Sequence, residues 1–135
     1  MGRNNPLRGI LILITLVLLA CQTGQPGPSD VKAAKADVEK LVKEGEAMLA
    51  LGHEGHLVKM AEHAQVMIEK ARAAIAAIPL HDPLGGQAIR HLKVVLDEAE
   101  SVVVHSRKGH QDDCILHAQK ALDRAKEAQS QTDAL

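Results

Sequence analysis

The chain contains no phenylalanine, tyrosine or tryptophan among its 135 residues. A β-sheet usually relies on aromatic and β-branched side chains, whereas closely packed helices can be built from alanine, leucine, isoleucine, valine and methionine. The length suffices for one small domain, which excludes a multidomain enzyme. We therefore expect an all-α domain, and a β fold is nearly excluded.

Residues 1–20 have the composition of a bacterial export signal. Arg3 and Arg8 precede an apolar run at residues 10–20, which is long enough for a signal peptide and too short to span a bilayer. The whole chain has 17 Asp and Glu against 16 Lys and Arg, so the part that follows the signal is more acidic still. This charge balance argues against nucleic acid as a partner.

The apolar run ends in the sequence LLAC, whose last residue is Cys21. This ending resembles the lipobox of bacterial lipoproteins, which implies that Cys21 is acylated and becomes the first residue after cleavage. Residues 21–29 are rich in glycine and proline and are predicted to form a flexible tether. The expected location is the periplasm, with a lipid on Cys21 as the membrane anchor, and the alternative is an unmodified cysteine beside the membrane.

Four segments after the tether show the apolar spacing of amphipathic helices. Short links between them predict an up-and-down four-helix bundle that occupies residues 30–131, with a loop at 79–86 and a polar tail after the last helix. The predicted helices cover about residues 30–51, 55–78, 87–108 and 110–128.

A shift of 54 residues aligns the second half of the bundle with the first. The matched segments are Gly55-His56 with Gly109-His110, and His63-Ala64-Gln65 with His117-Ala118-Gln119. The preceding helices match more loosely, and Glu44 falls on Glu98. Packing explains shared apolar positions but does not require shared histidines, so the pattern indicates two duplicated helical hairpins that share a histidine function.

Each repeat places a sulfur-containing residue between two histidines at the spacing i, i+4, i+7, which lies on one face of a helix. The two sets are His56, Met60 and His63, and His110, Cys114 and His117. Imidazole suits copper, nickel and zinc, and sulfur favours Cu(I), so the pattern predicts copper first, with nickel or zinc as alternatives. The competing interpretation makes Met60 and Cys114 core residues and leaves the histidines in solvent.

The chain has eight histidines in all, and the remaining four divide by position. His53 and His105 are expected at the end of the bundle where the second and fourth helices begin, so they are additional candidate ligands. The acidic residues expected nearby are Glu54, Asp112 and Asp113. His81 and His91 belong to the opposite end and are expected to be solvated. Because the second and fourth helices lie diagonally in a square bundle, two separate sites are expected rather than one shared ion.

Residues 52–74 and 108–128 resemble the small metal-binding protein family, whose members are histidine-rich periplasmic four-helix bundles made of repeated helical hairpins. The resemblance rests on Gly55-His56 and His63-Ala64 and on their counterparts 54 residues later, and it extends over about residues 31–130. It implies a protein that buffers, stores or detoxifies copper and other divalent metals. The chain departs from the family in having fewer histidines and in its apparent lipid anchor.

The sequence contains none of the motifs typical of enzymes, such as HExxH, a glycine-rich phosphate loop or the CxxCH of haem attachment. We therefore expect a binding protein rather than a catalyst, one that sequesters copper and similar ions in the bacterial periplasm. The alternative is a structural or protein-interaction lipoprotein with no metal role. The sequence does not identify a protein partner.

Overall fold

The computed structural model describes residues 26–135, which contain four α-helices and, over that range, no β-strand. The predicted signal at residues 1–20, the acylation site Cys21 and most of the tether lie outside the described residues. Between residues 26 and 135, no helix combines the length and the apolar character needed to cross a membrane. The helices are α1 (Pro28–His53), α2 (Leu57–Ala77), α3 (Pro83–Lys108) and α4 (Gln111–Asp133).

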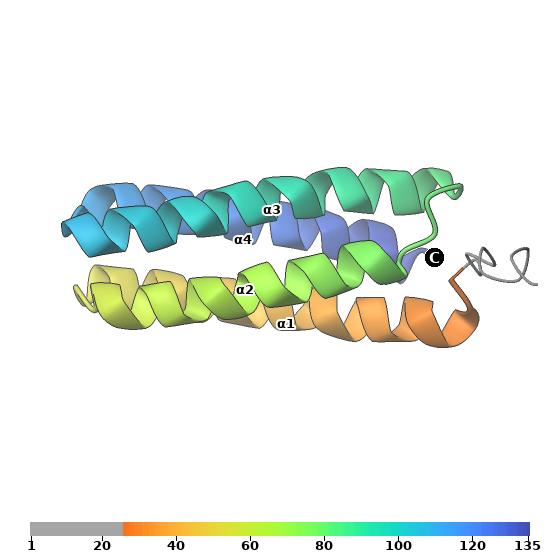
Figure 1. Cartoon of the computed structure of the whole chain (residues 1–135), viewed down its shortest axis with the longest axis horizontal. Helices are drawn as coiled ribbons and strands as arrows, with labels where there is room; N and C mark the ends of the chain where they lie inside the picture. The colour runs from red at the N-terminus through yellow and green to blue at the C-terminus, as the bar shows by residue number, and fades with distance from the viewer. Residues whose placement is uncertain (1–25) are drawn as a thin grey trace, which may run out of the picture.

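The helices form the up-and-down bundle that the sequence predicts. Helices α1 and α3 each pack against both α2 and α4, while α2 and α4 lie diagonally and barely touch. Both hairpin turns, α1 to α2 and α3 to α4, lie at one end of the bundle, and the link from α2 to α3 lies at the other (Figure 1). Histidines close to the two turns are therefore gathered at the same end.

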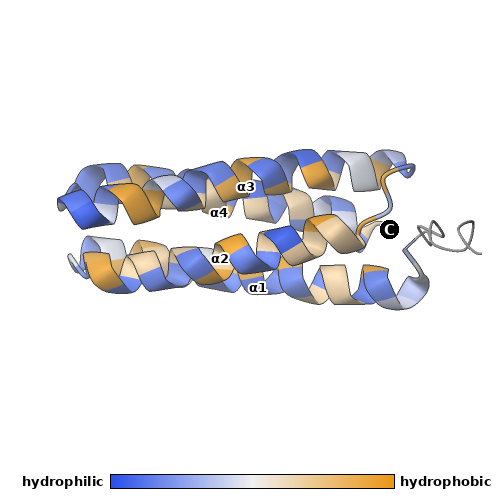
Figure 2. Ribbon diagram, in the orientation of Figure 1, coloured by the Kyte–Doolittle hydropathy of each residue, from blue (hydrophilic) through white to orange (hydrophobic). Residues whose placement is uncertain are grey.

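The core is made of small and flexible apolar side chains, as the lack of aromatic residues requires. Each helix alternates between polar and apolar residues along its length (Figure 2). Ten alanines on the four helices are fully buried, and they let the helix backbones approach closely. The largest fully buried side chains are Leu41, Met48, Met60, Met67, Ile78 and Leu92.

Helix α3 begins earlier than predicted, at Pro83 instead of after Gly86. The carboxylate of Asp82 caps this helix by accepting hydrogen bonds from the backbone N–H groups of Leu84, at 2.8 Å, and Gly85, at 3.1 Å. Proline suits the first helical position because the missing N–H has no partner there in any case. Gly85 is buried in this first turn, where a side chain would collide with the backbone oxygen of Pro79. The two glycines were thus wrongly interpreted as a loop signal.

Helix α4 continues to Asp133, past the predicted start of a polar tail. Ala128 and Thr132 are fully buried one turn apart, so the apolar stripe extends through this segment. The hydroxyl of Thr132 is satisfied by the carbonyl oxygen of Gln129 at 3.0 Å. A polar residue that bonds to its own helix can be buried at low cost, which composition alone does not reveal.

Candidate metal centre

The turn between α3 and α4 is built around a glycine. Gly109 adopts the left-handed conformation, with φ of 74°, and ends α3, while His110 occupies the N-cap position of α4. The backbone N–H of His110 donates to the carbonyl oxygen of His105 at 3.1 Å. This tight turn places the last residues of α3 directly against the first residues of α4.

Three side chains from this turn present donor atoms to one another. His105 Nδ1 lies 3.3 Å from His110 Nδ1 and 3.3 Å from Asp113 Oδ2, and His110 Nδ1 lies 3.5 Å from Asp113 Oδ2. Within residues 26–135, this is the group of histidine, cysteine and acidic side chains that could hold a metal ion. We refer to His105, His110 and Asp113 as the turn cluster.

The spacing of the turn cluster suits a metal ion. An ion about 2.05 Å from each of its tetrahedral ligands separates those ligand atoms by about 3.3 Å. The three observed separations, 3.3, 3.3 and 3.5 Å, are close to that value. Two imidazole nitrogens and one carboxylate oxygen would thus occupy three corners of a tetrahedron without large movement.

The surroundings of the turn cluster are open and electrostatically mixed. The side chains of His110 and Asp113 are half exposed, at 51% each, and they border a surface hollow that also includes Asp112. The carbonyl end of α3 favours a cation, and the N-terminus of α4 favours the carboxylate of Asp113. An ion held here would remain accessible to water and to exchange.

His117 lies beside the turn cluster, one helical turn after Asp113. Its ring stacks on that of His105, with the ring centroids 5.2 Å apart and the planes at 24°. Its Nδ1 is 2.5 Å from Oε2 of Glu98 on α3, and both side chains are largely shielded from solvent. The sequence did not predict this interhelical pair.

The first hairpin has the same glycine turn, histidine N-cap and His–Glu contact as the second, but not the same three donor side chains. Gly55 has φ of 78°, His56 caps α2, and His63 Nδ1 contacts the carboxylate of Glu44, each 54 residues before its counterpart. Leu51 and Lys59, however, stand where the second hairpin has His105 and Asp113. His56 instead lies 3.4 Å from Glu54. Thus, among residues 26–135, only the second hairpin gathers three side chains that could bind one metal ion.

The two sulfur atoms of the predicted stripes lie in the core. Met60 and Cys114 are both fully buried, and the Cys114 thiol points at the carbonyl oxygen of Val102, 3.7 Å away. Burial, with a smaller contribution from Asp113, raises the pKa of Cys114 and disfavours the thiolate that binds metals. In the described structure the sulfurs are therefore not brought together with the histidines, because the middle position of each stripe faces inward.

The first histidine of each predicted stripe lies at the N-cap, just outside its helix. His56 and His110 each precede the first residue of their helix, so neither lies on the helical face on which the stripes were predicted. His53 is exposed at the end of α1. His81 is exposed as expected, whereas His91 is partly buried and lies 2.9 Å from Glu127.

No protein-family model and no curated protein sequence matches this chain. The turn cluster and the chemistry of its donor atoms are therefore the main guide to function.

Proposed function

We propose that this protein binds divalent transition-metal ions at the turn cluster and serves to buffer or sequester copper, and also nickel and zinc, in the bacterial periplasm. The observation that carries the proposal is the triangle of donor atoms from His105, His110 and Asp113, with sides of 3.3 to 3.5 Å. The likeness of its Gly-His and His-Ala segments to the small metal-binding protein family supports the same function.

Copper is proposed first because of the affinity order of the donor atoms, whereas the tetrahedral spacing of the turn cluster on its own would suit Zn(II). Imidazole and carboxylate ligands bind divalent ions in the usual order of affinity, in which Cu(II) exceeds nickel and zinc. Sulfur plays no part in this preference, since the side chains of Met60 and Cys114 are fully buried. An exposed site that water can complete favours exchange of the ion, which suits a buffer better than a catalyst.

The proposed location follows from the N-terminal sequence. Residues 1–20 would direct export, and a lipid on Cys21 would hold the bundle at a membrane. Fractionation of bacteria that express the whole chain, followed by mass spectrometry of the N-terminus, tests this location. A processed chain that begins with an acylated Cys21 is the expected result, and an unprocessed cytoplasmic chain would contradict it.

Calorimetric titration of the purified protein with Cu(II), Ni(II) and Zn(II) tests the metal site. The double variant His105→Ala plus His110→Ala should weaken binding by at least about a hundredfold, because loss of a ligand costs more than loss of an outer partner. The matched control is His53→Ala plus His56→Ala, which removes two histidines from the other turn and should change affinity little.

Metal should also stabilise the fold through the same site. At a free metal concentration about 100 times the dissociation constant, the free energy of unfolding should rise by about 2.7 kcal/mol. The double variant at the turn cluster should lose this gain. Equal binding by both double variants, or no saturable binding by the parent protein, would instead favour a structural or interaction lipoprotein.

A further inference from the structure

The turn cluster supplies three donors, and a tetrahedral ion takes four. Building on the function proposed above, we propose that His117 supplies the fourth ligand through Nε2, and that Glu98 is the residue that orients its ring. The juxtaposition that carries this inference is the chain of contacts from Glu98 to His117 and from His117 to His105.

The contact with Glu98 determines which nitrogen of His117 can bind a metal. A carboxylate accepts hydrogen bonds, so the Nδ1 atom 2.5 Å from Glu98 Oε2 carries the proton and donates it. Nε2 of the neutral ring then has the free lone pair. Metal-binding histidines usually donate their other ring N–H to a carboxylate, which fixes the tautomer and the ring orientation.

The separations between rings are those of histidines that share an ion. With a metal about 2.05 Å from each nitrogen, the centroids of two imidazoles on a tetrahedral ion lie about 5.2 Å apart. The centroid of His105 is 5.2 Å from that of His117 and 5.6 Å from that of His110. The middle ring, His105, is thus at coordinating distance from both neighbours.

Binding through His117 requires a rotation of side chains. The ligand atoms of His117 do not belong to the mutually close group formed by the turn cluster. The ring of His105 must therefore turn out of its stacked arrangement with His117, whose own ring is held by Glu98, so that the donor atoms converge on one ion. His105 and His110 are partly exposed, at 26% and 51%, so rotation on their side is not blocked by the core.

The first hairpin provides a matched control within the same chain. His63 contacts Glu44 across α1 and α2 just as His117 contacts Glu98 across α3 and α4. His63, however, has no turn cluster beside it, because Leu51 and Lys59 replace two of the ligands. If these pairs served packing alone, loss of either pair would have the same effect on metal binding.

The experiment uses Co(II) as the probe, because its visible absorption bands are strong in four-coordinate sites and weak in six-coordinate sites. The purified protein is titrated beside His117→Ala and its control His63→Ala. We expect His117→Ala to weaken Co(II) binding by about 10- to 100-fold and to reduce the band intensity. His63→Ala should leave both the affinity and the spectrum unchanged.

The role of Glu98 is tested with Glu98→Gln and its control Glu44→Gln. The amide keeps the size of the side chain but can present its N–H₂ group to the ring, so the orientation of His117 is no longer fixed. Glu98→Gln should weaken Co(II) binding by about tenfold and shift the visible bands, and Glu44→Gln should do neither. Circular dichroism confirms folding, and Glu98→Gln carries the test should His117→Ala fail to fold.

The outcomes separate this inference from the proposed function. Unchanged affinity and bands in both His117→Ala and Glu98→Gln, with binding abolished by His105→Ala plus His110→Ala, overturns the fourth ligand and retains the turn cluster. Binding that survives His105→Ala plus His110→Ala, or is absent from the parent protein, overturns the proposed function itself.

Discussion

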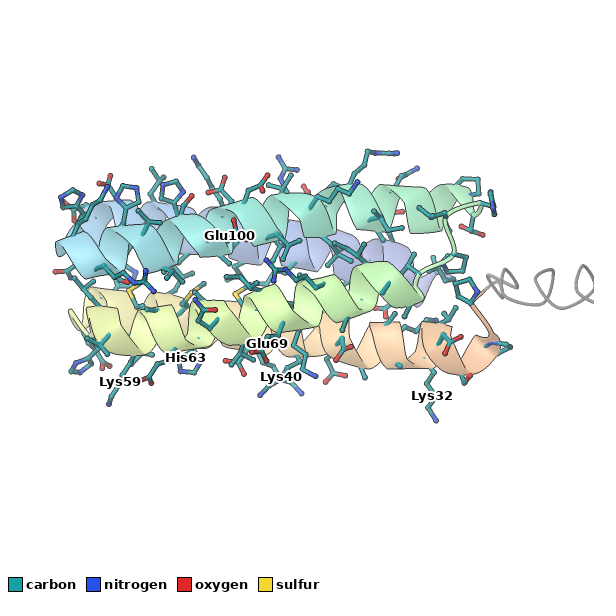
Figure 3. All side chains as sticks on the ribbon, in the orientation of Figure 1. Lys32, Lys40, Lys59, His63, Glu69 and Glu100 are labelled. Carbon is teal, nitrogen blue, oxygen red and sulfur yellow. The ribbon has the colours of Figure 1, made fainter. Side chains whose placement is uncertain are left out.

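Lys59 occupies in the α1–α2 hairpin the position that Asp113 occupies in the α3–α4 hairpin. Figure 3 shows Lys59 close to the turn end of α2, on the same side of the hairpin as His63 and Lys40. The two turns have the same backbone, since Gly55 and Gly109 have φ of 78° and 74°. The difference between the two hairpins therefore lies in side chains, and an ammonium group replaces the carboxylate of the turn cluster.

This relationship predicts that the missing site can be restored. The double variant Leu51→His plus Lys59→Asp completes, with His56, the same set of ligands on the same backbone frame. The number of bound Co(II) ions should rise from one to two by calorimetry and by visible absorption. Leu51→His alone is the control and should leave it at one. A folded double variant that still binds a single ion would show that the frame is not sufficient.

Removal of Asp113 gives the reverse prediction. Asp113→Lys places the ammonium group of the first hairpin in the turn cluster, where it repels a cation and supplies no ligand at neutral pH. Metal affinity should fall by at least about a hundredfold. Loss of a residue that only hydrogen-bonds a metal ligand already lowers affinity by about 10- to 100-fold, and loss of a ligand should lower it more. The control is Asp112→Lys, since Asp112 lies beside the site but outside the ligand group. A similar loss in both variants would indicate a general effect of charge.

Cys114 should be unreactive and dispensable for metal binding. Its thiol is fully buried and its pKa is raised by burial, so iodoacetamide should modify it slowly in the native protein and rapidly in urea. Cys114→Ala should change Cu(II) affinity by less than about twofold, because the site proposed at the turn cluster has only nitrogen and oxygen donors. Mass spectrometry and calorimetry measure the two effects. A large loss of Cu(II) affinity would restore the sulfur ligand that the sequence suggested.

The pair of Glu44 and Lys40 should make stability depend on pH. Burial by itself would raise the pKa of Glu44, but hydrogen bonds from Lys40 and His63 outweigh it and bring the pKa below its ordinary value of 4.5. The stabilisation that accompanies this lowered pKa is complete above that ordinary value and is lost as the pH falls through the lower, folded value. Lys40→Val removes one donor and copies the second hairpin, which has Val94 at this position.

Lys40→Val should lower the free energy of unfolding at pH 7 by up to about 1 kcal/mol, as expected for a half-exposed ion pair. The difference from the parent protein should shrink as the pH is lowered from 7 to 3 and the carboxylate takes up a proton. Urea unfolding at both pH values measures this. Lys32→Val, in the same helix, is the control, because Lys32 is exposed and the lysines that form ion pairs within residues 26–135 are Lys40, Lys43, Lys70 and Lys126. Its effect should be small and independent of pH.

The sequence predicted the fold well because the fold depends on local periodicity. Spacing of alanine, leucine and valine along four segments is enough to define amphipathic helices, and short links define their order. The errors in the predicted helices lie at helix ends, where a single contact can determine whether a residue is helical. Gly85 belongs to a helix because Asp82 caps the first turn of α3, and Thr132 belongs to α4 because it continues the buried stripe of Ala128.

The candidate site was predictable in part. The sequence places His105 at the end of the third predicted helix and Asp113 at the start of the fourth, so both were expected near the turn between them. The sulfur atoms of the stripes are buried in the structure, which the sequence did not show, since helical spacing shows which residues share a face but not whether that face points inward. The pairing of His117 with Glu98 depends on how α3 and α4 are aligned in the bundle. Its trace in the sequence is the spacing of 19 residues, which recurs between Glu44 and His63.

Gly85 and Gly86 should respond in opposite directions to the same substitution. A Cβ on Gly85 would lie 2.3 Å from the backbone oxygen of Pro79 and 3.0 Å from Ile78 Cγ2, so Gly85→Ala forces the α2–α3 link to move. Overpacking of this kind costs about 1 to 3 kcal/mol, which exceeds the roughly 1 kcal/mol that alanine gains over glycine in a helix. A Cβ on Gly86 would have no neighbour closer than 4.0 Å, so Gly86→Ala should stabilise the protein by about 0.4 to 1 kcal/mol. Urea unfolding measures both changes, and equal stabilisation by the two would mean that the link gives way without cost and that Gly85 is not required for close packing.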